Sequence, residues 1–422
     1  MGKRIIFHVD VNSAFLSWSA VYRLQELGEQ RDLRAIPSVV ADERDIRRGI
    51  VLAKSIPAKK FGVKTGEPLG MAREKCPQLA VVPPDYGLYV TASRSFIRLL
   101  REFSPLVEQY SIDEAWVDMT GTTELFGPPV LAAEKMKNRI RDELGFTVNI
   151  GVSTNKLLAK MAGDFQKPDR VHTLFPEEIE KKLWPLPVRE LFSVGPATER
   201  KLRNLGIATI GELAKSDPML LRQKLHKPGL VLWHFANGRG DDALLSAPTE
   251  NKSYGNSMTT PWDVTTEQEG RQVLLSLCET VATRLRKDGK RAALIGVSLR
   301  GTDFQTVARQ RGMKTRTNAT EEIYAAACEV FASLWDGQPL RQLGVSVGKV
   351  SEVRERQCTM FDDEDPERRE RMDAAVDAIR AKYGEDAILR ARLMDGVAGN
   401  MAGGLSRHRR SGVTKPIPEE GK

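Results

Sequence analysis

The chain has 422 residues, of which 41% are hydrophobic and 28% charged, and this composition excludes a disordered or collagen-like protein. Lysine and arginine exceed aspartate and glutamate by 64 − 56 = 8, which favours a polyanionic partner. No apolar run approaches the roughly 18 residues of a membrane helix and the scattered cysteines form no CxxC pair, so we expect a cytoplasmic protein without membrane, disulfide or zinc-finger elements.

The first half of the chain alternates buried strands with amphipathic helices. A strand at residues 4–9 brings Asp10 to its carboxyl end, and helical spacing of apolar side chains follows at 12–27. The further predicted elements are short strands at 37–41 and 49–53, helices at 56–61 and 92–103, a strand-like run with a bend at 106–119, a helix at 129–144, a strand at 147–152 and a helix at 155–165.

The second half changes character at residue 176, where short helices and Gly-Pro turns predict a small helical domain. A polar stretch then leads into helices at 267–287 and 321–335 that alternate with strands at 294–300, 305–309 and 343–350, which predicts an α+β sandwich. A charged helix is predicted within 362–392, and its apolar stripe from Met372 to Tyr383 fits docking on this protein or on a partner. The Gly-, Arg- and Lys-rich end from 396 is predicted to be disordered.

Two acidic positions far apart in the sequence carry the main chemical signal. Asp10 ends the first strand, while Asp113 and Glu114 interrupt an apolar stretch. Adjacent side chains on a flat strand point to opposite faces, so the chain must turn at Asp113 for the pair to converge, and we expect a hairpin tip there. Three carboxylates with few positively charged neighbours repel one another, and a Mg²⁺ ion bound by their oxygens would neutralise that repulsion. Either position alone is equally typical of a solvated acid.

At this point the sequence resembles the Y family of translesion DNA polymerases, of the bacterial polymerase IV/V-like type. The resemblance covers residues 4–361 and is carried by several motifs in order: HVDVNSAF at 8–15, KKFGVKTG at 59–66, YSIDEA at 110–115, GVSTNKLLAK at 151–160 with Lys167-Pro168 beyond it, and residues 195–207.

The resemblance implies a multidomain α+β fold, a right-hand polymerase of palm, fingers and thumb with an added little-finger domain. The implied boundaries are 1–18 and 81–171 for the palm, 19–80 for the fingers, 172–240 for a thumb with a helix-hairpin-helix, 241–251 for a linker, 252–350 for the little finger and 351–422 for a C-terminal tail.

The resemblance also implies the site residues. Asp10 and Asp113 would hold two Mg²⁺ ions (or Mn²⁺) with the Val11 carbonyl assisting, and Glu114 would complete the site. Phe15 matches the steric-gate position, while Lys59 and Lys167 match positions that contact the incoming dNTP. Ile56 departs from the tyrosine found in many members, so a phosphate-binding hydroxyl is missing there.

Contacts with primer-template DNA are predicted in the thumb and in the basic segment 284–316. The turn at Gly195 leads into a helix that carries Lys201, and such a helix N-terminus presents N–H groups to phosphate. The strand around Val297 alternates packing side chains with Arg300, and further cations follow at Arg309 and Arg311, which suits a duplex backbone. The alternative is that these cations lie on solvent-exposed faces and do not bind DNA.

The run QCTMF at residues 357–361 resembles a peptide that binds a sliding clamp. Gln357, Met360 and Phe361 would fill a groove on that partner, although a linker with a stray Met-Phe remains open. The sequence as a whole predicts a monomeric, low-fidelity, template-directed lesion-bypass polymerase. A non-catalytic DNA- and clamp-binding scaffold and a two-metal repair nuclease are the alternatives.

Overall fold

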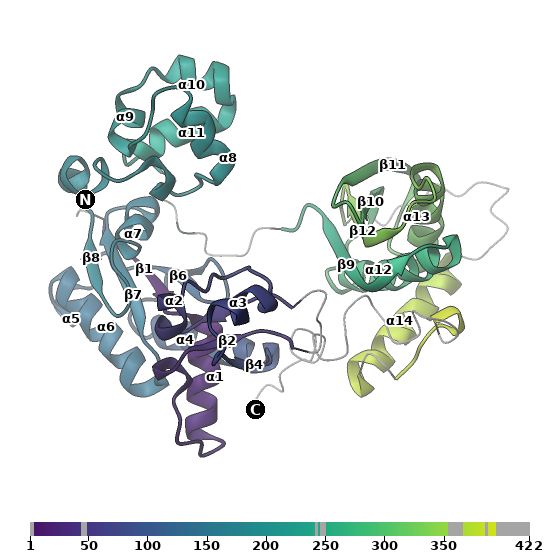
Figure 1. Cartoon of the computed structure of the whole chain (residues 1–422), viewed down its shortest axis with the longest axis horizontal. Coiled ribbons are helices and arrows are strands. Elements are labelled where there is room, and N and C mark those ends of the chain that lie inside the picture. Colours follow the sequence, from purple (N-terminus) through teal and green to yellow (C-terminus); the bar gives the residue numbers. More distant parts are fainter. Residues whose placement is uncertain are drawn as a thin grey trace. The chain divides into compact units, whose positions relative to one another are not determined.

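The computed structural model describes residues 4–43, 49–240, 244, 250–352, 366–384 and 387–393. These residues form two compact units (Figure 1). The first unit holds most of the chain before residue 248, and the second holds most of the described chain from residue 250 onwards. None of the described helices is both long and apolar enough to cross a membrane.

The first unit is built on a five-stranded sheet in the order β5-β6-β1-β7-β8. Both faces of the central strand are covered, because Ile6, Phe7, His8 and Val9 are all buried. The elements of this layer are β1 (Ile6–Val11), α1 (Ala14–Gln25), α4 (Tyr86–Arg101), β5 (Val107–Gln109), β6 (Glu114–Asp118), α5 (Thr123–Phe126), α6 (Pro129–Leu144), β7 (Val148–Ser153), α7 (Lys156–Gly163) and β8 (Val171–Thr173).

Helix α7 lies unusually close to the sheet at the strand that neighbours β1. A Cβ atom on Gly151 of β7 would come within 1.8 Å of the Ala159 carbonyl oxygen, so only glycine allows this approach. Because Gly151 lies opposite His8 in the β1–β7 register, α7 covers the face of β1 that also carries Asp10.

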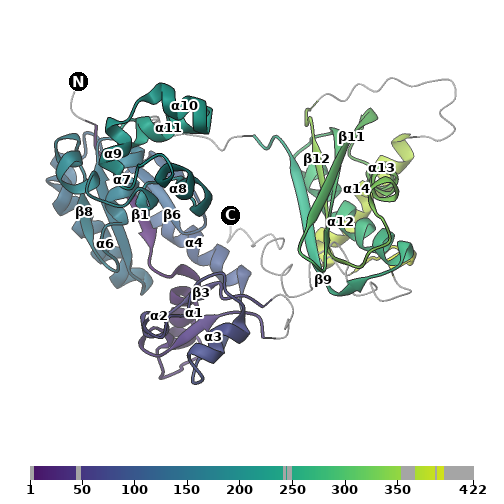
Figure 2. The same cartoon turned by 45° about the horizontal axis from the view of Figure 1, so that its top comes forward.

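A smaller sheet in the order β3-β2-β4 forms the fingers layer (Figure 2). Its core joins the strands to two short helices through Val39, Val51, Ala58 and Ala72. The elements are η1 (Leu33–Ala35), β2 (Ser38–Val40), β3 (Ala53–Lys54), α2 (Ile56–Lys60), α3 (Leu69–Lys75) and β4 (Ala80–Val82); α3, β4, α5 and β8 lacked a clear sequence signal.

The small helical domain shares its core with α7, since Leu158 and Met161 pack with Leu183, Leu202 and Leu213. This shared core ties the thumb helices to the palm sheet. The elements are η2 (Pro176–Glu178), η3 (Ile179–Leu183), η4 (Val188–Glu190), α8 (Pro196–Arg203), α9 (Ile210–Lys215), α10 (Pro218–Leu225) and α11 (Lys227–Ala236).

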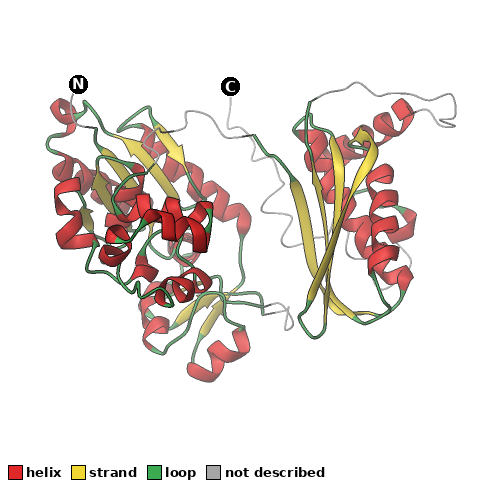
Figure 3. Ribbon diagram, turned by 90° about the horizontal axis from the view of Figure 1, so that it is seen from above, coloured by secondary structure: helices red, strands yellow, loops and turns green. Residues whose placement is uncertain are grey.

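The second unit is an antiparallel sheet in the order β11-β10-β12-β9 with helices on one side of it (Figure 3). Helix α12 begins at a capping box, in which Thr266 accepts from the Glu269 amide and Glu269 accepts from the Thr266 amide. The elements are β9 (Tyr254–Val264), α12 (Glu267–Lys287), β10 (Ala292–Gly301), β11 (Thr306–Thr317), α13 (Thr320–Leu334) and β12 (Leu340–Gly348). The sequence predicted α12 at its observed bounds and missed β9.

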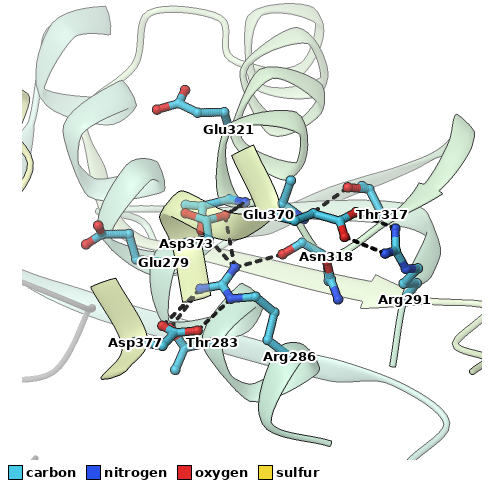
Figure 4. A network of polar contacts seen from close by, with 12 residues as sticks. Glu279, Thr283, Arg286, Arg291, Thr317, Asn318, Glu321, Glu370, Asp373 and Asp377 are labelled. Atoms are coloured by element: carbon cyan, nitrogen blue, oxygen red, sulfur yellow. Dashed lines mark hydrogen bonds and ion pairs between the residues drawn. The ribbon is translucent and has the colours of Figure 1, made fainter. Parts of the chain in front are cut away.

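Helix α14 (Pro366–Tyr383) and the turn η5 (Ala391–Leu393) dock on this unit through charged side chains (Figure 4). Arg286 of α12 binds both oxygens of Asp377, with distances of 2.6 and 3.1 Å, and Asp373 at 3.2 Å. Glu279 is 2% exposed and accepts from Arg380 and Arg390 at 3.1 and 3.0 Å.

The apolar stripe of α14 does not make this contact. Met372 is 47% exposed and Tyr383 is 68% exposed, while Asp373 on the docked face is buried and caps α13 by accepting from the Thr320 amide. The helix therefore attaches to its own chain through its polar face. The glycine-rich end from residue 396 lies outside the described residues.

Candidate active site

Two of the three predicted acidic residues, Asp10 and Glu114, face each other across neighbouring strands. Asp10 of β1 pairs in antiparallel register with Glu114 of β6. Side chains directly opposite each other in such a pair share one face of the sheet, with Cβ atoms about 4.5–5.5 Å apart. The carboxyl end of β1 and the start of β6 therefore present two carboxylates at one place.

The third carboxylate sits in the turn between β5 and β6, as the sequence predicted. The amides of Tyr110 and Ser111 both donate to the Glu114 carbonyl, which closes the turn. Asp113 is held there because the Ser111 hydroxyl donates to its carboxylate at 2.6 Å. The Val11 amide donates to the Asp113 carbonyl at 3.0 Å, so the end of β1 and the turn are fixed to each other.

A lysine reaches Asp10 from the loop after α7. Lys167 donates to Oδ2 of Asp10 at 3.0 Å and to Asp164 at 2.9 Å. Burial raises the pKa of Asp10, and the ion pair with Lys167 opposes that rise without cancelling it. The loop is held by Asn149, opposite Asp10 on β7, whose amide donates to the Gly163 and Gln166 carbonyls.

A second lysine and a histidine bind Glu114. Lys160 of α7 and His8 of β1 both approach the same oxygen, Oε2, the histidine through Nε2 at 3.2 Å. Burial opposes ionisation of Glu114, but hydrogen bonds from His8 and Lys160 outweigh it and lower its pKa to about 2. Burial also lowers the pKa of His8, so the imidazole is neutral at pH 7.

The expectation of little cationic company around the carboxylates was therefore wrong. Lys160 ended the GVSTNKLLAK motif without an assigned contact, and His8 had no assigned role, although His8 is two residues from Asp10 on a strand and so shares its face. In the described part of the chain, no three His, Cys, Asp or Glu side chains gather closely enough to hold a metal ion. Asp10, Asp113 and Glu114 offer carboxylate oxygens, the donors that a hard divalent cation prefers, so the residue types fit such an ion although the side chains are not gathered around one point.

Phe15 lies in the first turn of α1, beside the carboxylates in sequence. Its ring stacks on the buried Tyr89 of α4, with centroids 4.4 Å apart and planes 7° from parallel. Phe15 itself is only half-buried. One face of the ring is thus supported from below, which a ring used as a steric surface requires.

The fingers layer carries exposed lysines, but it has no hydroxyl at position 56, where many family members have a tyrosine. Ile56 opens α2 and is 48% exposed, and Lys59 is exposed in the last turn of the same helix. Lys54 of β3 donates to Thr65 at 3.2 Å, and burial together with the nearby Lys59 charge lowers the pKa of Lys54. Sequence reasoning missed Lys54.

The predicted DNA-contacting residues divide into two groups. Gly195 is the N-cap of α8, with Lys201 exposed along that helix, and Arg300 shares the open face of the little-finger sheet with Ser298. Arg309 and Arg311 lie opposite Val297 and Ile295, whose side chains face the helices, so these arginines do not share the open face as predicted. They bind Ser333 and Glu329 of α13 instead.

The predicted clamp peptide, with Gln357, Met360 and Phe361, lies outside the described residues. The three carboxylates and Lys167 come together around the carboxyl end of β1, and Phe15 follows in the first turn of α1 in the same unit. Lys59 lies in the fingers layer of the same unit, and Arg300 lies in the second unit.

Comparison with known protein families identifies three matching segments. Residues 9–164 match the impB/mucB/samB family, residues 176–207 match the helix-hairpin-helix motif of that family, and residues 251–360 match its C-terminal domain.

Relatives and solved structures agree with these matches. A protein of Clostridium acetobutylicum named DNA polymerase IV is 44% identical over 393 residues, which cover 93% of this chain and 98% of the relative. One of Bacillus subtilis named DNA polymerase IV 2 is 35% identical and covers 93% of this chain and 95% of the relative. A chimeric Y-family DNA polymerase superimposes with a TM-score of 0.69 over 82% of this chain and 99% of its own, at 23% identity. The predicted α+β right-hand fold is confirmed.

Proposed function

The chain belongs to the impB/mucB/samB family of Y-family DNA polymerases, and from that premise we propose how its palm carries out DNA synthesis. It is a DNA-directed DNA polymerase of the translesion type, with template-primer DNA and dNTPs as substrates, and it depends on divalent metal. Relatives named as polymerases along nearly the whole chain favour neither the scaffold nor the nuclease.

The proposed catalytic residues are Asp10, Asp113 and Glu114, which would hold two Mg²⁺ ions, or Mn²⁺, with the Val11 carbonyl. The observation that carries this proposal is the register of Asp10 against Glu114 with Asp113 in the adjoining turn. Two such ions would supply charge neutralisation at the attacking and leaving oxygens of the phosphoryl group. The protein's own part would be to bring these three carboxylates together at the carboxyl end of β1, the central strand of the sheet.

The proposed triphosphate contacts are Lys167 and Lys59. Lys167 already lies beside Asp10, so it needs only to exchange a carboxylate for a phosphate oxygen when the dNTP arrives. Lys59 would not have to break an ion pair to bind a phosphate, because its ammonium forms none with the described residues.

Phe15 is proposed as the steric gate against a ribose 2′-hydroxyl. Support comes from its half-buried ring, held flat against Tyr89 beside the carboxylates. Exclusion would act through a clash with the wrong sugar rather than through lost attraction. Phe15→Ala should raise the ratio of rNTP to dNTP efficiency at least about tenfold, and an unchanged ratio would leave Phe15 as a packing residue.

The proposed domain boundaries are palm 1–18 and 81–171, fingers 19–80, thumb 172–240, linker 241–251, little finger 252–350 and tail 351–422. The docked α14 adds to this proposal a C-terminal helix that works as part of the little-finger body.

DNA contact is proposed for Gly195 and Lys201 of the thumb and for Arg300, with Arg309 and Arg311 at the sheet edge. If about six phosphates are neutralised, the logarithm of the binding constant should fall with log salt at a slope near −5. Arg300→Glu should flatten this slope more than Arg311→Glu, because Glu329 already pairs with Arg311. Equal slopes for both variants would reject the open-face assignment.

The segment 357–361 is proposed as a sliding-clamp peptide on an otherwise monomeric enzyme. Alanine at Gln357, Met360 and Phe361 should abolish clamp stimulation of synthesis and leave clamp-free synthesis intact. Sedimentation of the full chain at micromolar concentration tests the monomer, which a concentration-dependent rise in mass would contradict.

The deciding experiment is primer extension by the full chain on a primed template with Mg²⁺ and dNTPs. The proposal predicts template-directed products that EDTA abolishes. Primer shortening without dNTPs would point to the nuclease, and DNA binding without extension would point to the scaffold.

A further inference from the structure

Lys160 is a buried cation with a single carboxylate partner. Its side chain is 10% exposed, and among the described residues Glu114 is the one group that accepts a hydrogen bond from its ammonium. Two aromatic rings flank the ammonium, Tyr110 at 5.3 Å and Phe192 at 5.6 Å from the ring centroids. A desolvated ammonium between two rings is held more firmly than a surface lysine.

The contact is asymmetric within the glutamate. Oε2 of Glu114 takes both the Lys160 ammonium and the His8 ring, whereas no described residue donates to Oε1. The buried Nδ1 of His8 has no hydrogen-bond partner among the described residues, which fits a neutral ring whose proton is on Nε2 and points at Glu114. Two donors therefore occupy one oxygen and leave the other open.

This arrangement depends on how closely α7 approaches the sheet. Gly151 lets the helix backbone lie against β7, and Lys160 follows directly after Ala159, whose carbonyl makes that close approach. The thumb contributes Phe192 to the surroundings of Lys160. Its amide lies 3.4 Å from the sulfur of Met161, the residue after Lys160 on α7. Palm and thumb thus both confine the lysine.

We propose that Lys160 is a positioning residue that, together with His8, reserves Oε2 of Glu114 and leaves only Oε1 for a divalent metal ion. This inference rests on the metal site proposed above. Ligands of a metal are commonly oriented by such outer contacts, whose loss typically costs roughly 10–100-fold in affinity or activity.

Removal of Lys160 should move metal affinity and turnover in opposite directions. Both oxygens of Glu114 become available and a positive charge near the site disappears, so a divalent ion binds at least as tightly. The carboxylate then loses its fixed orientation, so turnover falls by roughly 10–100-fold. A merely structural lysine would lower both quantities together.

Lys156 on the same helix is a matched control. It is 14% exposed, pairs with Glu108 at 2.8 Å and lies 4.7 Å from the Trp116 ring, so it has the same kind of surroundings without touching Glu114. Lys156→Met removes an equivalent buried ion pair and should leave metal affinity and turnover near those of the parent.

The experiment compares the parent with Lys160→Met and Lys156→Met as full chains. Mn²⁺ binding is titrated by electron paramagnetic resonance on the metal-free proteins, and kcat, KM for dNTP and the DNA dissociation constant come from primer extension and anisotropy. The expected result for Lys160→Met is an equal or lower Mn²⁺ dissociation constant, kcat down at least about tenfold and unchanged DNA binding.

Weaker Mn²⁺ binding together with slower turnover, or parent-like values for both, would overturn the proposal. Equal effects of the two lysine variants would do the same. If Lys160→Met does not fold, Lys160→Gln gives the same comparison with a neutral polar side chain. A parent that neither binds Mn²⁺ nor extends primers would instead reject the proposed metal site itself.

Discussion

Two groups of buried acids in this protein are held by different cations. In the palm, Lys160 contacts one oxygen of Glu114 and Lys167 contacts one oxygen of Asp10, the carboxylates proposed as catalytic. On the little finger, Arg286 and Arg390 contact several acids at once, and Arg286 grips both oxygens of Asp377. Both groups pair acids with cations, but the cations are lysine ammonium groups in the palm and arginine guanidinium groups on the little finger.

The difference follows from the chemistry of the two side chains. A guanidinium presents five donors in a rigid fork and locks carboxylates in place, whereas an ammonium is a compact charge on a flexible stem that exchanges partners readily. Asp373 and Asp377 have both oxygens occupied, whereas Glu279 binds Arg380 and Arg390 through one oxygen and keeps a buried Oε2 with no partner among the described residues. Asp10 and Glu114, next to lysine, each keep an oxygen that no described residue contacts, so we propose the palm group for chemistry and the little-finger group for attachment of α14.

The largest expected effect tests the palm side of this comparison. Asp113→Ala and Glu114→Ala should each slow primer extension by at least roughly 10²–10³-fold, as the loss of a preorganised electrostatic group does. Asp377→Asn, a change in the little-finger group, should leave the rate unchanged. Single-turnover extension measures both, and near-normal synthesis by Asp113→Ala would remove it from the metal site.

The next effect tests the little-finger side. Arg286→Met leaves Asp373 and Asp377 without this cation in a mostly buried place, which should lower the free energy of unfolding of that unit by about 3 kcal/mol. Lys167→Met in the palm should cost under about 1 kcal/mol, because that lysine is 37% exposed. Urea denaturation gives both values, and similar losses would erase the distinction.

A smaller effect separates charge from shape. Arg286→Lys keeps the positive charge but replaces the planar guanidinium by a single ammonium. That ammonium cannot bind Asp377, Asp373 and the Asn318 carbonyl at the same time as the arginine does. We expect about 1–2 kcal/mol of lost stability by the same denaturation measurement. Parent-like stability would mean that charge alone holds α14.

The smallest effect concerns pH. The pKa of Glu114 is lowered from 4.5 to about 2, so its pairing with Lys160 stabilises the fold above pH 4.5 and this contribution is lost as pH falls toward 2. The difference in unfolding free energy between the parent and Lys160→Met should therefore shrink across that window. A difference that grows on acidification would contradict the assigned pairing.

Local patterns predicted those parts of the fold that local physics determines. The first strand follows from a buried apolar run, the turn at Asp113 from the need to bring two adjacent acids together, and the helix at 267–287 from its helical pattern. The site was proposed because its acids end or interrupt apolar, strand-like stretches.

Tertiary contacts produced what the sequence did not predict. Lys160 reaches Glu114 only because Gly151 admits α7 to the sheet, and no periodicity reports such an approach. Helix α14 attaches to its own chain through ion pairs, which the apolar stripe did not reveal, and docking of that exposed stripe on a partner stays a prediction. Arg309 and Arg311 lie on the helix-facing side because the register pairs them with Val297 and Ile295 of β10, and such a pairing is not read from either strand alone.

We propose that the palm acids, and not the acids held by arginine, bind the divalent metal of DNA synthesis. The direct measurement is Mn²⁺ titration by electron paramagnetic resonance of the parent, Asp10→Asn and Asp373→Asn. We expect binding in the parent and in Asp373→Asn, with at least about tenfold weaker binding in Asp10→Asn, since a lost carboxylate removes both a ligand and a charge. Undiminished binding in Asp10→Asn would show that the metal does not bind at the palm acids.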